Sequence, residues 1–138
     1  MQPIDIMVQL PRKLVNKLLH FAQQSPMEEI CGLVGGKNAV PQTYYPITNV
    51  AETLQNRFLL DVKEQITAFK TMREKGEEFF AIYHSHPTAA AFPSTFDLDM
   101  ANYDNTLYFI TSLHVKGILE LRAFRIKNKK AIEISITL

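Results

Sequence analysis

The sequence predicts a single α/β domain in which a mixed sheet is flanked by helices. Strand and helix patterns alternate along the first two thirds of the chain, and three strand patterns follow one another after residue 107. There is no repeat, low-complexity tract or linker among the 138 residues. That length is sufficient to bury a core in one domain, so we expect one domain over residues 1–138.

Composition excludes several classes of protein. Hydrophobic residues make up 46% and charged residues 21%, as in ordinary soluble globular proteins. A formal net charge of +1 gives no support to a nucleic-acid or membrane partner. The single cysteine, Cys31, excludes an internal disulfide and a multi-cysteine zinc site. Because there is neither a signal-peptide pattern nor a long apolar run, we expect a cytoplasmic protein.

Apolar periodicity predicts the elements of the first half. Pro11 suits the first position of a helix, and Ser25-Pro26 would stop that helix. A tight turn is expected at Gly35-Gly36, closing an apolar strand. We expect the strands of this half at residues 4–10, 30–34 and 40–47, the last two paired as a hairpin.

The second half begins with a short strand pattern at residues 58–60. Asp61 then starts a helix, Glu64 completes a capping box, and Gly76 ends the helix. Pro87 ends the next strand because it has no N–H for the ladder. We expect the strands of this half at residues 58–60, 79–86, 107–113, 117–126 and 131–138.

The polar side chains of residues 79–99 form a set that core packing does not require. His84 and His86 alternate on a strand, so they face the same side and can share one ion. Ser94 is a predicted helix N-cap, with Asp97 three residues on, which could bring a carboxylate back to the two imidazoles. Asp99 is the rival carboxylate, but two residues along a helix it would face away.

These residue types indicate a catalytic metal. Two imidazoles and one carboxylate are a recurrent zinc set that leaves a fourth position for water, whose pKa zinc lowers towards ~7. Amide hydrolysis also needs a group that moves the proton of that water to the leaving nitrogen. Glu28 and Glu29 are both candidates, at the start of the apolar strand. The Ser94 hydroxyl could donate to the oxyanion of the tetrahedral intermediate.

Three segments together resemble the JAMM motif of the MPN (Mov34, JAB) metalloprotease family. That motif is a glutamate, then His-x-His-Pro, six residues, and Ser-x-x-Asp; here residues 88–93 supply the six. The likeness covers nearly the whole chain, as in the compact bacterial members. The segments are Glu29-Ile30-Cys31-Gly32-Leu33, His84-Ser85-His86-Pro87 and Ser94-Thr95-Phe96-Asp97.

The resemblance implies a fold like that of the cytidine deaminases, without their chemistry, because the chain lacks His-x-Glu and Pro-Cys-x-x-Cys. It implies that Glu29, three residues before Gly32, is the general acid/base in preference to Glu28. It also implies one zinc per chain and an oxyanion donor, with His84, His86 and Asp97 as the zinc ligands and Ser94 as the donor.

The function that the resemblance implies is hydrolysis of a peptide or isopeptide bond at the C-terminal tail of a ubiquitin-like or sulfur-carrier protein with a Gly-Gly end. Such a tail would add as a strand to a sheet edge. The sequence is also compatible with a homodimer. The alternative is a non-catalytic MPN scaffold that only binds partner proteins; such members usually lack a ligand, and here all are present.

Overall fold

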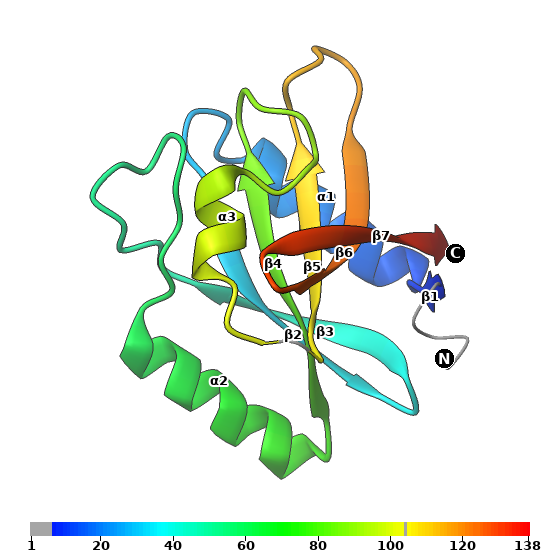
Figure 1. Cartoon of the computed structure of the whole chain (residues 1–138). Helices are drawn as coiled ribbons and strands as arrows, with labels where there is room; N and C mark the ends of the chain where they lie inside the picture. The colour runs from blue at the N-terminus through cyan, green and yellow to red at the C-terminus, as the bar shows by residue number, and fades with distance from the viewer. Residues whose placement is uncertain (1–6, 104) are drawn as a thin grey trace.

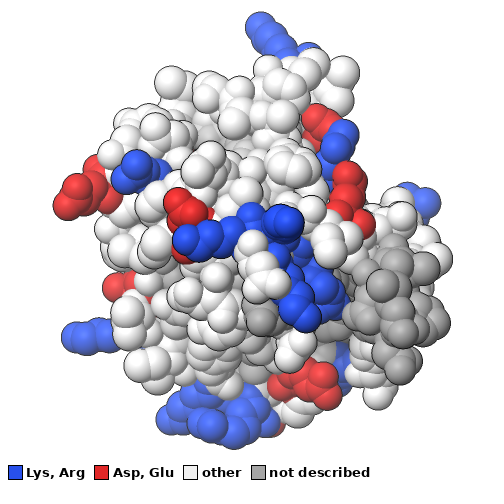
Figure 2. Space-filling model, viewed as in Figure 1, with Lys and Arg blue, Asp and Glu red and all other residues white. Residues whose placement is uncertain are grey.

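The computed structural model describes residues 7–103 and 105–138. In this part of the chain no helix combines the length and apolarity needed to span a bilayer. Basic and acidic side chains both occur on the face drawn in Figure 2, most of which is uncharged. The elements are β1 (Met7–Gln9), α1 (Arg12–Gln23), β2 (Cys31–Lys37), β3 (Val40–Ile47), α2 (Val62–Lys75), β4 (Glu78–His86), α3 (Thr95–Met100), β5 (Leu107–Ser112), β6 (Glu120–Lys127) and β7 (Lys130–Thr137).

The strands form one mixed sheet, which confirms the predicted α/β class (Figure 1). Their order is β1-β7-β6-β5-β4-β2-β3. The pairs β1/β7 and β4/β5 are parallel, and the other neighbours are antiparallel. Parallel strands need a crossover connection, and the one between β4 and β5 carries α3.

Helices cover both faces of the sheet. α1 packs on one face and lies behind the strands in Figure 1, whereas α2 and α3 pack on the other. Side chains of β4 alternate between these faces: Tyr83 belongs to the core under α1, and Ile82 to the core under α2. His84 and His86 lie two and four residues after Ile82 on the same strand, so their side chains point to the same face as Ile82, the face that α3 covers.

Two predictions about the first half are wrong in detail. Pro11 is the N-cap of α1, one position before the first helical residue. The two glycines lie inside β2, and the turn falls at Asn38 and Ala39, whose φ angles are 53° and 63°. A Cβ on Gly36 would lie 2.4 Å from the Val40 carbonyl oxygen, so this glycine permits the close approach of β3. Of the predicted strand 4–10, residues 7–9 form β1, and residues 4–6 lie outside the described part.

The predicted strand at residues 58–60 is wrong. Leu60 forms only an isolated bridge with Asn49. Two backbone hydrogen bonds, from Val50 to Leu59 and from Asp61 to Thr48, flank this bridge, and the pairing is too short to make a strand. The boundaries of α2 are confirmed: the Asp61 carboxylate accepts from the Glu64 N–H at 2.9 Å, and Gly76 closes the helix with φ 73°. The Glu64 carboxylate accepts instead from the N–H of Thr48 at 2.8 Å, so it does not complete a capping box.

The strands predicted after residue 107 are confirmed, with one shifted boundary. β6 starts at Glu120, because Gly117 lies in a turn with a left-handed φ of 83°. Asn128 and Lys129, with φ 52° and 59°, form the tight turn that joins β6 to β7 at the predicted place.

Candidate metal centre

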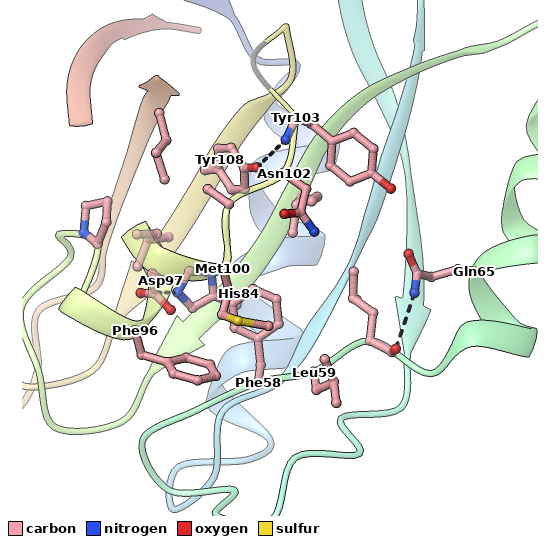
Figure 3. Close-up of a pocket in the computed structure, with 16 residues that line it drawn as sticks. Phe58, Leu59, Gln65, His84, Phe96, Asp97, Met100, Asn102, Tyr103 and Tyr108 are labelled. Atoms are coloured by element: carbon pink, nitrogen blue, oxygen red, sulfur yellow. Dashed lines mark hydrogen bonds and ion pairs between the residues drawn. The ribbon is translucent and has the colours of Figure 1, made fainter. Parts of the chain in front are cut away.

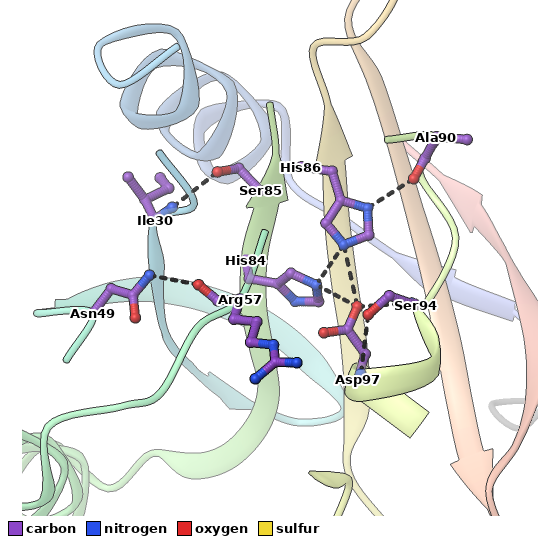
Figure 4. Close-up of polar contacts among 9 residues, drawn as sticks. All are labelled: Ile30, Asn49, Arg57, His84, Ser85, His86, Ala90, Ser94 and Asp97. Carbon is purple, nitrogen blue, oxygen red and sulfur yellow. Dashed lines mark hydrogen bonds and ion pairs between the residues drawn. The ribbon is translucent and has the colours of Figure 1, made fainter. Parts of the chain in front are cut away.

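Three side-chain atoms converge at the C-terminal end of β4 (Figure 4). Nε2 of His84, Nε2 of His86 and Oδ2 of Asp97 lie 3.1 Å from one another in all three pairs. All three residues are buried. Ligands bound to one tetrahedral zinc at ~2.0–2.1 Å are separated by roughly 3.3 Å. The observed spacing therefore fits one shared ion.

The hydrogen bonds around these atoms also fit a cation. Nδ1 of His86 donates to the Ala90 carbonyl at 2.7 Å, so the lone pair of its Nε2 faces the other two atoms. The ring of His84 stacks on Phe58, with 4.3 Å between ring centroids. Within the described residues, buried Nδ1 of His84 and Oδ1 of Asp97 have no hydrogen-bond partner. Because Nδ1 of His86 carries the proton, the lone pairs of its Nε2 and of Asp97 Oδ2 face each other at 3.1 Å, which is unfavourable in a buried site unless a proton or cation lies between them.

The N-terminus of α3 positions Asp97. A capping box holds it: the Asp97 N–H donates to Ser94 Oγ at 3.0 Å, and the Ser94 N–H donates to Asp97 Oδ2 at 2.9 Å. The predicted cap is thus confirmed, and the Ser94 hydroxyl proton stays available for another acceptor. Asp99 is exposed and lies 3.7 Å from Lys129, so it faces away from the histidines as predicted.

Glu29 reaches the site from the segment before β2. Cys31 pairs directly opposite His84 in the antiparallel ladder. The Ser85 N–H donates to the Ile30 carbonyl at 3.0 Å, and the Ile30 N–H donates to Ser85 Oγ at 2.9 Å. The start of β2 therefore lies beside the C-terminal end of β4. Glu29 is only 4% exposed, and it offers a carboxylate oxygen within 4.8 Å of the ligand atoms of both histidines.

Asn49, in the loop after β3, holds the segment that carries Glu29, a role that no sequence pattern predicts. The Asn49 side-chain amide donates to the carbonyls of Glu29 at 3.0 Å and Arg57 at 2.9 Å. Its oxygen accepts from the N–H groups of Ala51 at 3.0 Å and Leu59 at 2.9 Å. An asparagine in a turn-forming stretch indicates a loop, but no spacing rule predicts four partners spread over 30 residues.

The family described as prokaryotic homologs of the JAB domain matches residues 11–127. The chain belongs to this family. The CysO-cysteine peptidase of Mycobacterium tuberculosis is 32% identical over 115 residues, which are 82% of this chain and 78% of the relative. A probable TtuB-protein conjugate cleaving protease of Thermus thermophilus is 30% identical over 99 residues, 71% of this chain and 66% of the relative.

Solved structures confirm the JAB/MPN fold. The solution structure of a Desulfitobacterium hafniense protein matches with a TM-score of 0.84 and 32% identity, covering 95% of this chain and 92% of that one. A JAB1/MPN domain protein of Archaeoglobus fulgidus matches with a TM-score of 0.60 and 17% identity over 95% and 97% of the two chains, which is a likeness of fold. With its family and its peptidase relatives, this JAB-domain chain is a JAMM-type hydrolase.

Burial shifts the titration of the groups in this JAB domain. Burial raises the pKa of Glu29 to about 8, the neighbouring His86 acts in the opposite direction, and the charge of Asp97 adds to the rise. Burial lowers the pKa of His84, against the attraction of Asp97. Burial would raise the pKa of Asp97, but its contacts with the two histidines hold it well below its usual range. A neutral imidazole and an ionised carboxylate are the forms that bind metal.

Cys31 is part of the core. Its side chain is buried, and its thiol lies 3.4 Å from the Ile47 carbonyl oxygen. Burial raises the pKa of this thiol to about 12, so it stays protonated at neutral pH. Cys31 is therefore a packing residue and does not act as a nucleophile.

Proposed function

We propose that this chain is a zinc peptidase that hydrolyses a peptide or isopeptide bond after the C-terminal tail of a ubiquitin-like or sulfur-carrier protein ending in Gly-Gly. The observation that carries the proposal is the convergence of His84, His86 and Asp97 at 3.1 Å beside the buried carboxylate of Glu29. The names of the Mycobacterium and Thermus relatives, a CysO-cysteine peptidase and a TtuB-conjugate protease, support the substrate class.

His84, His86 and Asp97 would hold one zinc per chain. Their donor set and their spacing fit this ion. When bound, zinc supplies the Lewis acidity that makes water a nucleophile near neutral pH. The alternative ligand set of Glu29 with the two histidines is geometrically open, but it would leave the site without its proton-transfer group.

Two other residues would carry the reaction. The Glu29 carboxylate takes the proton of the attacking water and delivers it to the leaving nitrogen. Its burial makes the carboxyl a weaker acid, so it can hold that proton at neutral pH. The Ser94 hydroxyl donates to the developing oxyanion, since its oxygen accepts from the Asp97 N–H while its own proton stays free.

The substrate tail would enter as an extended strand along β3. β3 is an edge strand of the sheet, and its last residue, Ile47, pairs with Cys31, which is opposite His84. An added strand there would run towards the metal centre. Pro41 and Pro46 have no N–H to donate, so main-chain pairing on this edge is limited mainly to the residues between them.

Mass spectrometry tests the proposal directly. Zinc-loaded protein is incubated with sulfur-carrier proteins that bear short extensions after Gly-Gly, and the products are weighed. Cleavage after the second glycine is the expected result. A protein that contains no stoichiometric metal and leaves every carrier intact would instead support the non-catalytic scaffold.

A further inference from the structure

The loop between β4 and α3 fixes the ring of His86. The Nδ1–H of His86 donates to the Ala90 carbonyl at 2.7 Å (Figure 4), and the Phe92 N–H donates to the same carbonyl at 2.8 Å. Both lone pairs of that carbonyl oxygen are thus occupied. A histidine that binds a metal needs such a partner, because the bond selects the tautomer whose Nε2 lone pair faces the ion. The position of residue 90 therefore decides how His86 presents its ligand atom.

Ser112 anchors the same loop from the neighbouring strand. It is the register partner of His86 in the parallel pairing of β4 with β5, and it is only 1% exposed. Its hydroxyl donates to the Ala89 carbonyl at 2.6 Å, one residue before the acceptor of His86. Residues 88–90 are exposed, so they gain little from packing. The hydrogen bond from Ser112 therefore ties the exposed part of the loop to the sheet.

The hydroxyl of Ser112 has one hydrogen to donate and two lone pairs. Three groups surround its oxygen: the Ala89 carbonyl, which can only accept, the His114 N–H at 3.1 Å, which can only donate, and Nδ1 of His114 at 2.6 Å. If Nδ1 carries a hydrogen, all three bonds form. If Nδ1 is a bare lone pair, it competes with the carbonyl for the single hydrogen of Ser112. A carboxylate oxygen of Glu120, 4.0 Å from Nδ1, favours the form with the hydrogen.

Ser112 lies away from the side on which the metal centre opens. His84 and Asp97 line an apolar cavity beside the centre (Figure 3). Among the described residues, neither His86 nor Ser112 belongs to the wall of that cavity. A change in the Ser112 side chain can therefore reach the metal centre through the loop and His86 while the cavity wall keeps its residues.

We infer that Ser112 is a positioning residue for the zinc ligand His86. Its hydroxyl fixes the Ala89 carbonyl, and the next carbonyl along the chain fixes the imidazole ring. The Nδ1–H of His114 keeps the hydrogen of Ser112 directed at the loop. The inference rests on the proposed function in taking His86 as a ligand. Outer partners of metal ligands contribute about 10- to 100-fold in metal affinity or activity.

Zinc affinity, measured by competition with a chromophoric chelator, tests the role of Ser112. Ser112→Ala should weaken zinc binding about 10- to 100-fold. Thr111→Val is the matched control: it removes a buried hydroxyl from the other face of β5, where Thr111 is hydrogen-bonded to the Tyr83 hydroxyl at 2.8 Å. Both variants should unfold at lower denaturant concentration, but Thr111→Val should keep the wild-type zinc affinity. Wild-type affinity in Ser112→Ala, or an equal loss in both variants, would overturn the inference.

Two substitutions of exposed His114 test the direction of its hydrogen bond and leave Ser112 in place. His114→Asn puts an amide N–H where Nδ1–H lies and should keep the wild-type zinc affinity. His114→Asp puts an acceptor there and should weaken zinc binding about 10-fold. The added negative charge alone would strengthen zinc binding, so charge does not account for a loss. Equal affinities of the two variants would overturn the role of His114.

The NMR signal of the His86 Nδ1–H in zinc-free protein gives a readout that depends neither on zinc nor on hydrolysis. This proton should exchange with water about 10-fold faster in Ser112→Ala, as expected for the loss of one buried hydrogen bond. It should exchange at the wild-type rate in Thr111→Val. If wild type binds zinc but cleaves no carrier, the proposed activity fails and the zinc affinities still test Ser112. If wild type binds no zinc, the ligand role of His86 fails as well, and equal exchange rates would also overturn the link between Ser112 and the ring.

Discussion

The two sides of the metal centre are built over very different distances along the chain. The ligand side comes from one contiguous stretch, in which His84 and Asp97 are 13 positions apart. The proton-transfer side comes from Glu29, and it is held by bonds that span 55 positions, from Ile30 to Ser85, and 20 positions, from Asn49 to Glu29.

The difference lies in what fixes each side. The strand period aims the two histidines, and a helix cap aims Asp97, so the ligand atoms are positioned mostly by local structure. Glu29 is positioned by the pairing of β2 with β4 and by the Asn49 loop. Metal binding and proton transfer should therefore respond to different mutations.

Asp97→Asn should have the largest effect. The amide oxygen can still accept from the Ser94 N–H, so the cap of α3 is kept, while an anionic ligand is lost. We expect zinc content far below one per chain and a fall in hydrolysis of more than about 10³-fold. Metal analysis and carrier cleavage measure the two effects. Asp99→Asn is the matched control and should behave as wild type; a fully zinc-loaded, active Asp97→Asn would remove Asp97 from the ligand set.

Glu29→Gln should separate chemistry from metal binding. The substitution removes a proton-transfer group, so hydrolysis should slow by about 10²- to 10⁴-fold. Zinc content should stay at one per chain, because the ligand side is intact. Glu28→Gln, an exposed neighbour, is the control. Loss of zinc from Glu29→Gln would show that the two sides are not independent and that Glu29 is itself a ligand.

The same difference explains how much of the site the sequence could predict. His84, His86, Ser94 and Asp97 follow rules of short range: alternation on a strand, and a capping box whose two members are three positions apart. Those rules predict their convergence, and the structure confirms it. Glu29 required the resemblance to a family, because Glu28 has the same chemistry and nothing local decides between them.

Long-range packing also explains the errors in the fold. The pair Gly35-Gly36 has the composition of a turn, yet both glycines lie in β2, because their lack of a side chain lets β3 and neighbouring groups approach. The apolar residues 58–60 have the composition of a strand, yet they form the wall of a cavity beside His84. In both cases the structure depends on which distant segment packs against these residues. The local sequence pattern does not carry that information.

Asn49→Ala should weaken the proton-transfer side alone. It deletes both amide donors and the oxygen that accepts from Ala51 and Leu59, leaving polar groups of the loop unpaired. We expect a loss of about 2–3 kcal/mol in the free energy of unfolding and slower hydrolysis at unchanged zinc content. Denaturant unfolding and metal analysis measure these. Asn56→Ala, exposed in the same loop, should change neither; reduced zinc in Asn49→Ala would contradict the separation.

The smallest expected effect is a gain in stability of the zinc-free protein on Glu29→Gln. Burial raises the pKa of Glu29 from an ordinary value of 4.5 to about 8, so the folded state binds a proton that the unfolded state has released. The contribution of the Glu29 carboxyl to stability is therefore fully present below about pH 4.5 and is lost as the pH rises towards 8. Glutamine is neutral throughout, and the variant should be more stable than wild type at pH 7.

The gain should be about 1–2 kcal/mol, less than the full pKa shift implies, because the buried amide must itself find partners. Thermal unfolding of both proteins in chelator, between pH 4.5 and 8, measures it, with Glu28→Gln as the control. The difference between Glu29→Gln and wild type should shrink towards zero at the acid end. A difference that does not depend on pH would mean that the carboxyl is ionised in the folded protein even without zinc, and that Glu29 meets a positive partner which compensates its burial.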